Sequence, residues 1–181
     1  WTVFSYEKAQ RISDAVSNAN DTVEEQKILA RVFAEGDRFY KGHEGGFPAN
    51  EVLDVQKSID SMKGLKFAGI TSFPALLYDQ EAKDVMPTHN MKTLEETAAV
   101  LARAGMKDIE INAPGTTSSV VFEKLAKAGA TQVEPGHGLT GTTPLHAVKD
   151  LAERPALIYV SEVSHVYNGK PYCFGGGMYI D

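Results

Sequence analysis

Two short loops carry the side chains of this sequence that are best suited to chemistry. The first, residues 114–119, reads Pro-Gly-Thr-Thr-Ser-Ser, and the second, residues 134–138, reads Glu-Pro-Gly-His-Gly. Glycines allow backbone N–H groups to approach an anion closely, and hydroxyl groups add further donors. Because both loops are expected to follow strands, we interpret them as one phosphate site. Its candidate ligands are Gly115, Thr116, Thr117, Ser118, Gly136, His137 and Gly138.

Glu134 adds a second kind of chemistry to this phosphate site. It lies two residues before Gly136, where a carboxylate would meet a protonated ring nitrogen of a phosphorylated cofactor. Pyridoxal 5′-phosphate (PLP) has both a phosphate group and such a nitrogen. Simpler interpretations stay open: residues 115–119 as a helix-capping turn, Glu134 in a structural salt bridge, and His137 as a structural hydrogen-bonding residue.

Composition and charge restrict the class of protein. The 181 residues, 43% of them hydrophobic, are enough to bury a core. The formal net charge of -6 argues against binding to nucleic acid or to an anionic membrane surface. No apolar run approaches the ~20 residues that a membrane span needs. The single Cys173 excludes an internal disulfide and favours the cytoplasm.

The two loops must be positioned by elements that alternate between strand and helix. Apolar runs predict strands, and apolar residues at helical spacing predict helices. The expected strands are residues 2–5, 28–33, 67–73, 108–112 and 131–134. The expected helices are residues 6–19, a helix capped by Asn50 that buries Val52, Val55 and Ile59, and residues 94–104 and 120–128. This alternation predicts a parallel α/β fold, with a loop from Pro74 through Pro87 to Asn90.

The pattern changes after Gly141. Residues 157–164 alternate with the period of a strand, and Asn168-Gly169 is a strong hairpin-turn signal before a returning strand at residues 170–174. We therefore expect residues 1–143 to form an α/β unit and residues 156–181 to form the start of an antiparallel β-domain.

These features resemble the fold-type III PLP enzymes, which are built on an alanine racemase-like barrel. Residues 134–137 are similar to the Glu-Pro-Gly-Arg segment of the fold-type III decarboxylases, with His137 in place of the arginine. Residues 69–73 resemble the sixth barrel strand and residues 112–119 the phosphate loop after the seventh. Along most of its length the chain is similar to the YhfX-type amino-acid racemase-like proteins. The resemblance implies part of a (β/α)8 TIM-type barrel, about strands 4 to 8, followed by the start of a C-terminal antiparallel β-domain.

The resemblance also implies roles for residues outside the two loops. Asn112 joins the cofactor-binding residues, as does Ser72, which stands where many of these racemases carry a histidine. His165, Tyr172 and Cys173 lie where the family brings one subunit's β-domain to the partner's active site, and Tyr172 or Cys173 would serve there as an acid or base. Core packing or hairpin pairing is the alternative for these three residues. We therefore expect a homodimer.

The lysine that forms the Schiff base with PLP belongs to the first barrel strand of this family. No lysine of this chain matches that position, because the chain is expected to begin near the fourth strand. The resemblance thus implies that the remaining N-terminal part of the barrel belongs to the same or another polypeptide.

Four functions follow from the two loops and the resemblance. The first is a PLP-dependent racemase that acts at the α-carbon of an amino acid. A PLP-dependent decarboxylase or aldolase is favoured by Glu134, a non-catalytic PLP-binding protein is a third possibility, and a phosphate-binding barrel without PLP a fourth. No metal site is assigned, because His43 and Glu44 lack further spaced ligands. His89 and His146 are expected at the surface.

Overall fold

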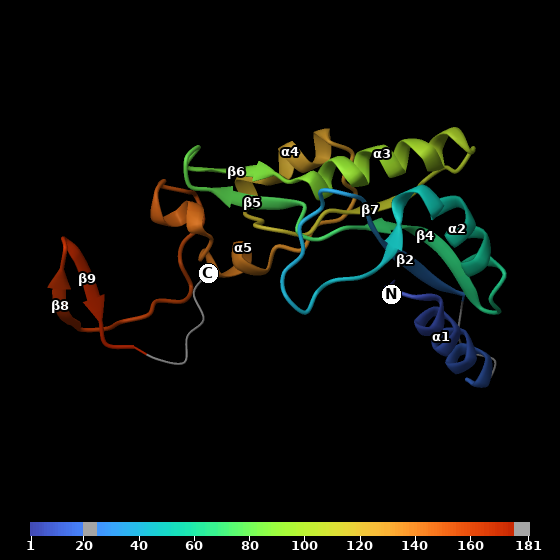
Figure 1. Cartoon of the computed structure of the whole chain (residues 1–181), viewed down its shortest axis with the longest axis horizontal. Helices are drawn as coiled ribbons and strands as arrows, with labels where there is room; N and C mark the ends of the chain where they lie inside the picture. The colour runs from blue at the N-terminus through green and yellow to red at the C-terminus, as the bar shows by residue number, and fades with distance from the viewer. Residues whose placement is uncertain (20–24, 176–181) are drawn as a thin grey trace.

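A parallel sheet lies at the centre of the computed structural model, which describes residues 1–19 and 25–175 (Figure 1). Its strands are β1 (Thr2–Val3), β2 (Gln26–Phe33), β4 (Leu65–Thr71) and β7 (Glu110–Asn112), in that spatial order, with the short β3 (Phe47–Pro48) paired to β2. Every pairing in this sheet is parallel. The predicted parallel α/β fold is therefore confirmed.

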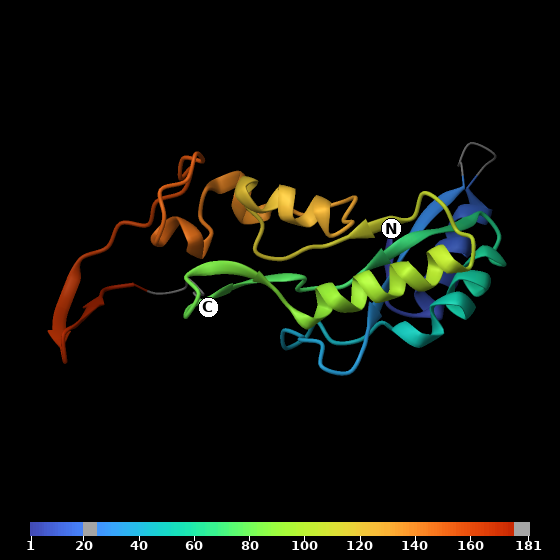
Figure 2. The ribbon, with the colours of Figure 1, turned by 90° about the horizontal axis from the view of Figure 1, so that it is seen from above.

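Three helices connect the strands of this sheet and pack against it. They are α1 (Tyr6–Asn18), α2 (Val52–Asp60) and α3 (His89–Arg103). Helix α1 packs on β1, α2 on β4, and α3 on β2 and β4, and α2 contacts both of the other helices (Figure 2). Val52, Val55 and Ile59 are fully buried, as their helical spacing predicts. The apolar face of each helix and the sheet thus share one core.

The starts of the helices agree only in part with what the sequence predicts. The Ser5 hydroxyl accepts a hydrogen bond of 3.2 Å from the Lys8 N–H and caps α1. The expectation that Asn50 caps α2 is wrong, because Asn50 lies inside a 3-10 turn, Ala49–Glu51, and Glu51 takes the cap position without a side-chain bond. Helix α3 begins at His89, one turn before the expected start.

The expected loop between β4 and α3 contains an antiparallel hairpin. Strands β5 (Leu76–Asp79) and β6 (Asp84–Pro87) pair across a turn in which the Asp79 carboxylate accepts hydrogen bonds of 2.9 and 2.7 Å from the N–H groups of Glu81 and Ala82. Such an Asx-type turn satisfies its own backbone donors. Two prolines near the hairpin had indicated a loop, but they lie at or outside its strand ends.

The expected strand at residues 131–134 is wrong in its extent. Only Gln132 forms a bridge, parallel to Asn112, and the Ala113 N–H donates to the Gln132 carbonyl at 3.1 Å. The pairing stops there because the chain after β7 turns toward β5 instead. The Pro114 carbonyl accepts from the Ala75 N–H at 2.7 Å, and Gly115 forms a bridge with Leu76.

Short helices follow β7. They are a 3-10 turn (Ser119–Val121) continuing into α4 (Phe122–Lys127), then α5 (Gly136–Thr140) and a 3-10 turn at Pro144–Ala147. The helix predicted at residues 120–128 is therefore confirmed in position. Among the described residues, no helix is long and apolar enough to cross a membrane.

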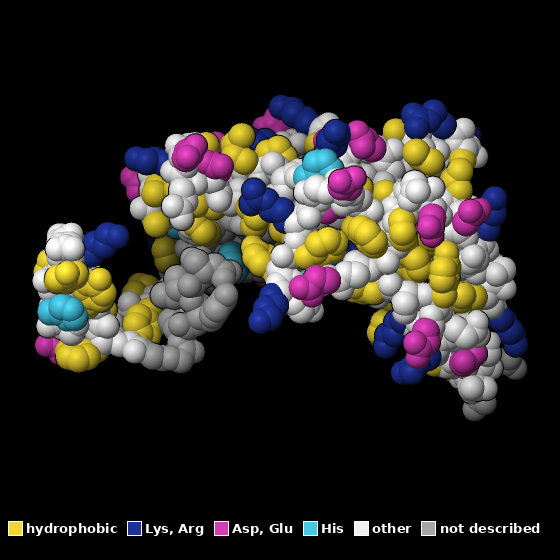
Figure 3. Space-filling model, viewed as in Figure 1, with side chains coloured by type: hydrophobic (Ala, Val, Ile, Leu, Met, Phe, Trp, Pro, Cys, Tyr) yellow, Lys and Arg dark blue, Asp and Glu magenta, His cyan; other side chains and the backbone are white. Residues whose placement is uncertain are grey.

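The antiparallel hairpin of β8 (Val163–Tyr167) and β9 (Lys170–Cys173) stands apart from the rest of the chain (Figures 1, 2 and 3). Asn168 and Gly169 have φ values of 48° and 74°, as the predicted two-residue turn requires. The strand expected from residue 157 begins only at Val163, and the apolar residues before it are exposed because nothing described covers them. Residues 176–181 of the expected β-domain lie outside the described residues.

Candidate functional site

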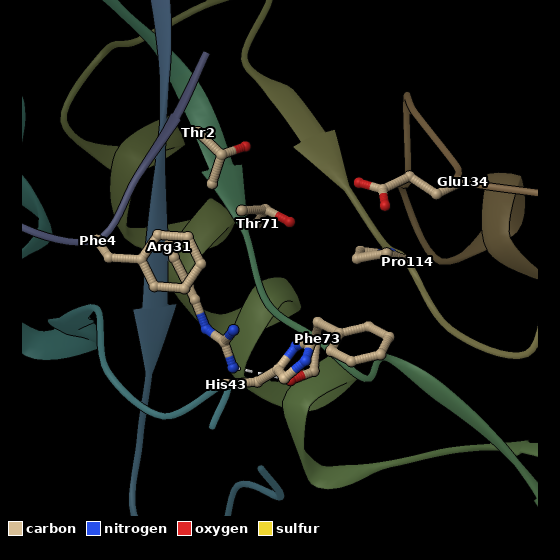
Figure 4. A pocket seen from close by; sticks show the side chains of 8 residues that line it. All are labelled: Thr2, Phe4, Arg31, His43, Thr71, Phe73, Pro114 and Glu134. Atoms are coloured by element: carbon tan, nitrogen blue, oxygen red, sulfur yellow. Dashed lines mark hydrogen bonds between the residues drawn. The ribbon is translucent and has the colours of Figure 1, made fainter. Parts of the chain in front are cut away.

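A cavity of about 290 Å³ lies at the carboxyl ends of the parallel strands (Figure 4). It is lined by Thr2, Phe4, Arg31, His43, Thr71, Phe73, Pro114 and Glu134. In parallel α/β sheets, ligands bind at this edge because the loops that follow the strands converge there. The first of the two loops meets this cavity through Pro114, and the second meets it through Glu134.

The Glu134 carboxylate is held at this cavity by Asn112. The Asn112 Nδ2 donates hydrogen bonds to Glu134 Oε1 at 2.7 Å and to Thr71 Oγ1 at 3.1 Å. Figure 4 shows the carboxylate pointing into the cavity from the side opposite Phe4 and Arg31. A carboxylate in this position accepts a hydrogen bond from a protonated ligand nitrogen, and its second oxygen stays available for one.

The two loops that the sequence predicts as one phosphate site lie against each other. A Cβ atom added to Gly138 would lie 2.6 Å from the Thr117 carbonyl oxygen and 3.2 Å from the Ser118 Cα. Only glycine therefore permits this approach at position 138. The Ser118 hydroxyl is buried and has no hydrogen-bond partner among the described residues, whereas the Thr117 hydroxyl donates to the Gly115 carbonyl at 3.0 Å.

Gly115 and Thr116 also serve the fold. A Cβ atom at Gly115 would lie 2.5 Å from the Leu76 carbonyl oxygen, and the Thr116 N–H donates to that oxygen at 2.9 Å. These two residues, with His137, line a second cavity of about 220 Å³ beside Tyr40, Phe73 and Leu77. The close approach of β5 therefore explains the glycine at position 115. Gly136, in contrast, has open space where a Cβ would lie, and this space is available to a ligand.

Arg31 is a residue of the site that sequence reasoning missed. It lies near the end of β2, is only 3% exposed, and donates from Nη2 to the Phe73 carbonyl at 3.0 Å. Its Nε has no hydrogen-bond partner among the described residues, and its guanidinium stacks 5.1 Å from the Phe4 ring and 5.2 Å from the Phe39 ring. The sequence does contain a signal for this residue, because Arg31 interrupts the apolar run of residues 28–33 and a charged side chain is unusual there.

Electrostatics around Arg31 favour an anionic ligand. Burial lowers the pKa of Arg31 from its ordinary value, while the carboxylates of Asp37 and Glu44 act in the opposite direction. An arginine stays protonated even so, because its ordinary pKa is far above neutral. The cavity is therefore lined by a buried positive charge, whose Nε is enclosed by the surrounding protein atoms.

The loop after β2 is tied to helix α3. The buried Asp37 carboxylate accepts hydrogen bonds from Thr93 Oγ1 at 2.8 Å and from the Ala34 N–H at 2.9 Å, and His89 Nδ1 lies 2.9 Å from it. This loop brings His43 to the cavity, where its ring contacts that of Phe73 at a centroid distance of 5.9 Å. The described residues contain no group of three or more metal-ligating side chains.

The remaining predicted site residues lie elsewhere. Ser72 is fully buried at the end of β4, and its hydroxyl accepts a hydrogen bond of 3.2 Å from Asn90 Nδ2. His165 and Tyr172 stack at 4.8 Å on the hairpin, where Cys173 is also exposed. Within the described chain these three hairpin residues do not reach the cavity (Figure 1). Their catalytic roles stay predictions.

The comparison with protein families agrees with this architecture. Residues 1–144 match the model of the alanine racemase N-terminal domain, and residues 158–181 match that of the YhfX-like C-terminal domain. The chain therefore belongs to the alanine racemase-like family, and its predicted resemblance to the YhfX-type proteins is confirmed.

One relative is "Uncharacterized protein YhfX" of Escherichia coli (strain K12), which is 39% identical over 178 residues. The match covers 98% of this chain and 45% of that protein, so the chain spans about half the length of the relative. A crystal structure of an unknown protein from Bifidobacterium adolescentis matches with a TM-score of 0.49 and 18% identity, over 73% of this chain and 49% of that one.

Proposed function

We propose that this chain is the PLP-binding part of an amino-acid racemase-like enzyme that acts at the α-carbon of its substrate. The observation that carries the proposal is the Glu134 carboxylate, which Asn112 holds at 2.7 Å beside the two loops. Membership of the alanine racemase-like family supports PLP as the cofactor. A ring-nitrogen partner and a phosphate site together match the two polar ends of PLP better than either does alone.

The residues present fit this cofactor. The buried Ser118 hydroxyl lacks a partner among the described residues, and a phosphate oxygen would supply one. Gly136 leaves space beside the second loop, and Gly138 allows that loop to pack on the first. The phosphate would be held by Gly115, Thr116, Thr117, Ser118, Gly136, His137 and Gly138, with Asn112 and Ser72 supporting the cofactor from the ends of β7 and β4.

When bound, PLP supplies an electron sink for negative charge that develops at the substrate α-carbon. The chain's own part is binding, orientation and proton control. Glu134 keeps the ring nitrogen protonated because its negative charge stabilises the positive charge there. Arg31 binds an anionic group of the ligand, and the Phe4 and Phe39 rings shield its guanidinium from water.

A proton donor or acceptor at the α-carbon would come from the hairpin of a second copy. Tyr172 or Cys173 is the candidate, with His165 stacked on Tyr172 at 4.8 Å. The exposure of Tyr172, 44%, leaves its ring available to a partner subunit. We accordingly propose a homodimer in the cytoplasm, where a lone exposed Cys173 stays reduced.

The proposal includes a larger barrel. We propose that residues 1–143 form about strands 4 to 8 of a (β/α)8 barrel and that residues 156–181 begin a β-domain. The remaining N-terminal part, in the same or another polypeptide, would supply the Schiff-base lysine, since no described lysine lines the cavity. The length of YhfX relative to this chain supports this arrangement.

A PLP-dependent decarboxylase or aldolase is the second candidate, and Glu134 favours it. A carboxylate at the ring nitrogen makes the ring a stronger electron sink than an arginine partner would. A non-catalytic PLP-binding protein is the third candidate, favoured by the distance of the hairpin residues from the cavity in this chain (Figure 2).

The test is hydrogen exchange at the α-carbon in deuterated solvent. The PLP-loaded protein is incubated with L- and D-amino acids, and proton NMR follows loss of the α-proton while chiral chromatography follows the enantiomers. A racemase exchanges the proton and interconverts the enantiomers, whereas a decarboxylase releases carbon dioxide. Because the Schiff-base lysine is proposed to lie in the N-terminal part of the barrel, the assay uses this chain together with that part, and PLP binding by this complete protein without exchange would establish the non-catalytic alternative. Intact mass before and after borohydride reduction reports whether a lysine of the preparation carries the cofactor.

A further inference from the structure

A half-buried acidic residue lies behind the first phosphate loop. The Glu153 carboxylate accepts a hydrogen bond from the backbone N–H of Ser119, the last residue of that loop. Its other oxygen, Oε2, lies 3.3 Å from His146 Nε2, and the two side chains are only 15% and 10% exposed. The expectation that His146 is a surface residue is therefore wrong.

The position of His146 is set by its neighbours. Its Nδ1 lies 2.8 Å from the Thr143 hydroxyl, which is itself buried, and the adjacent Leu145 is 1% exposed in the hydrophobic core. The imidazole is thus anchored on one side by the core and faces the carboxylate on the other. The pKa of Glu153 reflects this setting: burial would raise it, but the Ser119 N–H and the positive charge of protonated His146 hold it below its usual range.

The same segment also contacts the helix that begins in the second phosphate loop. Helix α5 carries Gly136 and His137 in its first turn and is followed by Gly141, where a Cβ atom would lie 2.7 Å from the Arg154 carbonyl oxygen. The Ala156 N–H donates to the Thr140 carbonyl at 2.6 Å. Residues 153–156 therefore contact the last residue of the first loop and the C-terminal end of α5. They lie between the two family matches, which end at residue 144 and resume at residue 158.

We propose that Glu153 is a positioning residue for the phosphate site and that His146 holds its carboxylate in place. The proposal rests on the phosphate site of the proposed function. The Ser119 N–H belongs to the planar peptide unit that begins at the Ser118 carbonyl carbon. Fixing this N–H therefore fixes the backbone beside the unpartnered Ser118 hydroxyl, and with it the loop that faces Gly138.

Charge explains why this role needs the pair rather than Glu153 alone. A carboxylate near a phosphate repels it, and the His146 ring, whose Nε2 lies 3.3 Å from Glu153 Oε2, offsets that repulsion when it carries a proton.

The test compares two ligands that differ only in the phosphate. Pyridoxine 5′-phosphate and pyridoxine both lack the aldehyde, so neither forms a covalent bond with a lysine, and isothermal titration calorimetry measures their affinities. We expect the wild type to prefer the phosphorylated ligand. We expect E153A to lose about tenfold of its affinity for that ligand, the usual effect of losing one charge-assisted hydrogen bond, while pyridoxine binding changes less than twofold.

Three variants complete the design. E153Q keeps an acceptor for the Ser119 N–H and should recover much of the affinity for pyridoxine 5′-phosphate that E153A loses. H146Q, like E153A, should lower the preference for the phosphorylated ligand. E123Q is the matched control, because Glu123 on α4 is 80% exposed and, within the described part of the chain, forms an ion pair with Lys127 alone. Circular dichroism checks that each variant folds. If E153A does not fold, the affinities of H146Q for the two ligands provide the test instead.

Each outcome separates the two proposals. Equal or undetectable binding of both ligands by the wild type would overturn the phosphate site, and the role of Glu153 with it. A wild-type preference that E153A and H146Q retain would overturn the role of Glu153 and leave the phosphate site standing. An equal loss for both ligands in E153A would show a general structural effect and would also overturn the positioning role.

Discussion

Asn112 and Glu134 are joined by a hydrogen bond of 2.7 Å from Nδ2 to Oε1, across the gap between β7 and the second loop. The same Nδ2 donates to Thr71 at the end of β4, so one amide ties two strand ends to the carboxylate. The other amide atom, Oδ1, is buried without a partner among the described residues. Asn112 thus orients Glu134 toward the cavity, which makes the pair the most direct target for mutation.

Replacing Glu134 by glutamine should change the protonation of a bound ring. We expect the ring nitrogen of bound pyridoxine 5′-phosphate to keep its proton to a higher pH in the wild type than in E134Q, by about one unit or more, because a nearby carboxylate favours the positive form. Ultraviolet absorbance titration of the bound ligand measures this. N112A should shift the titration in the same direction, and identical curves for all three proteins would contradict the assignment.

Removal of the Arg31 side chain should destabilise the fold. R31A loses the bond to the Phe73 carbonyl and both aromatic contacts, and it leaves a cavity between Phe4 and Phe39. We expect a loss of about 2 kcal/mol in the free energy of unfolding, measured by urea denaturation. R11A is the control, since Arg11 is 71% exposed and, among residues 1–19 and 25–175, forms an ion pair only with Glu7 on the same helix, so its effect should stay below about 0.5 kcal/mol. An equal effect of the two variants would count against a packed role for Arg31.

Glu110 should make stability depend on pH at the opposite end of the sheet. The Lys27 ammonium, 2.9 Å away, lowers the pKa of Glu110, and Gln132 adds a further hydrogen bond. Because the folded-state pKa is below the unfolded-state pKa, this stabilisation is fully present above the ordinary pKa of a glutamate. It is lost as the pH falls through the lowered pKa.

The corresponding variant is E110Q. We expect it to be about 0.5 kcal/mol less stable than the wild type at neutral pH, with the difference disappearing in acid. Urea denaturation at a series of pH values measures both. A difference that is constant across this range would show that the charge of Glu110 has no part in it.

Gly69 should tolerate no side chain. A Cβ atom there would lie 1.8 Å from the Glu110 carbonyl oxygen, where β4 pairs with β7 and the register of β2 and β4 shifts. We expect G69A to cost about 3 kcal/mol or more, because the strands must separate. G136A is the matched control: Gly136 has no atom near the position of a Cβ, so its stability should change by less than about 0.5 kcal/mol. Thermal unfolding of both variants gives the comparison.

The Arg31 and Glu153 assignments show the limit of reading the sequence alone. The apolar strand around Arg31 marks it as unusual without showing what it contacts, and His146 lies in a mixed segment that gives no such signal. Their importance arises from contacts with residues far along the chain, such as Phe73 for Arg31 and Glu153 for His146. Local patterns carry no information about such distant pairs.

The sequence by itself determined the alternation of strands and helices, the two loops, the Asn168-Gly169 turn and the family. The first three of these features depend on local backbone preferences and side-chain periodicity, which act over a few residues, whereas the family was indicated by the resemblance of its motifs. Only the tertiary structure decided that residues 131–134 pair at a single position, because Gly115 is bridged to Leu76 of a hairpin that looked like a loop. It also decided that Glu134 and Arg31 share one cavity, since parallel pairing brings the ends of distant strands together.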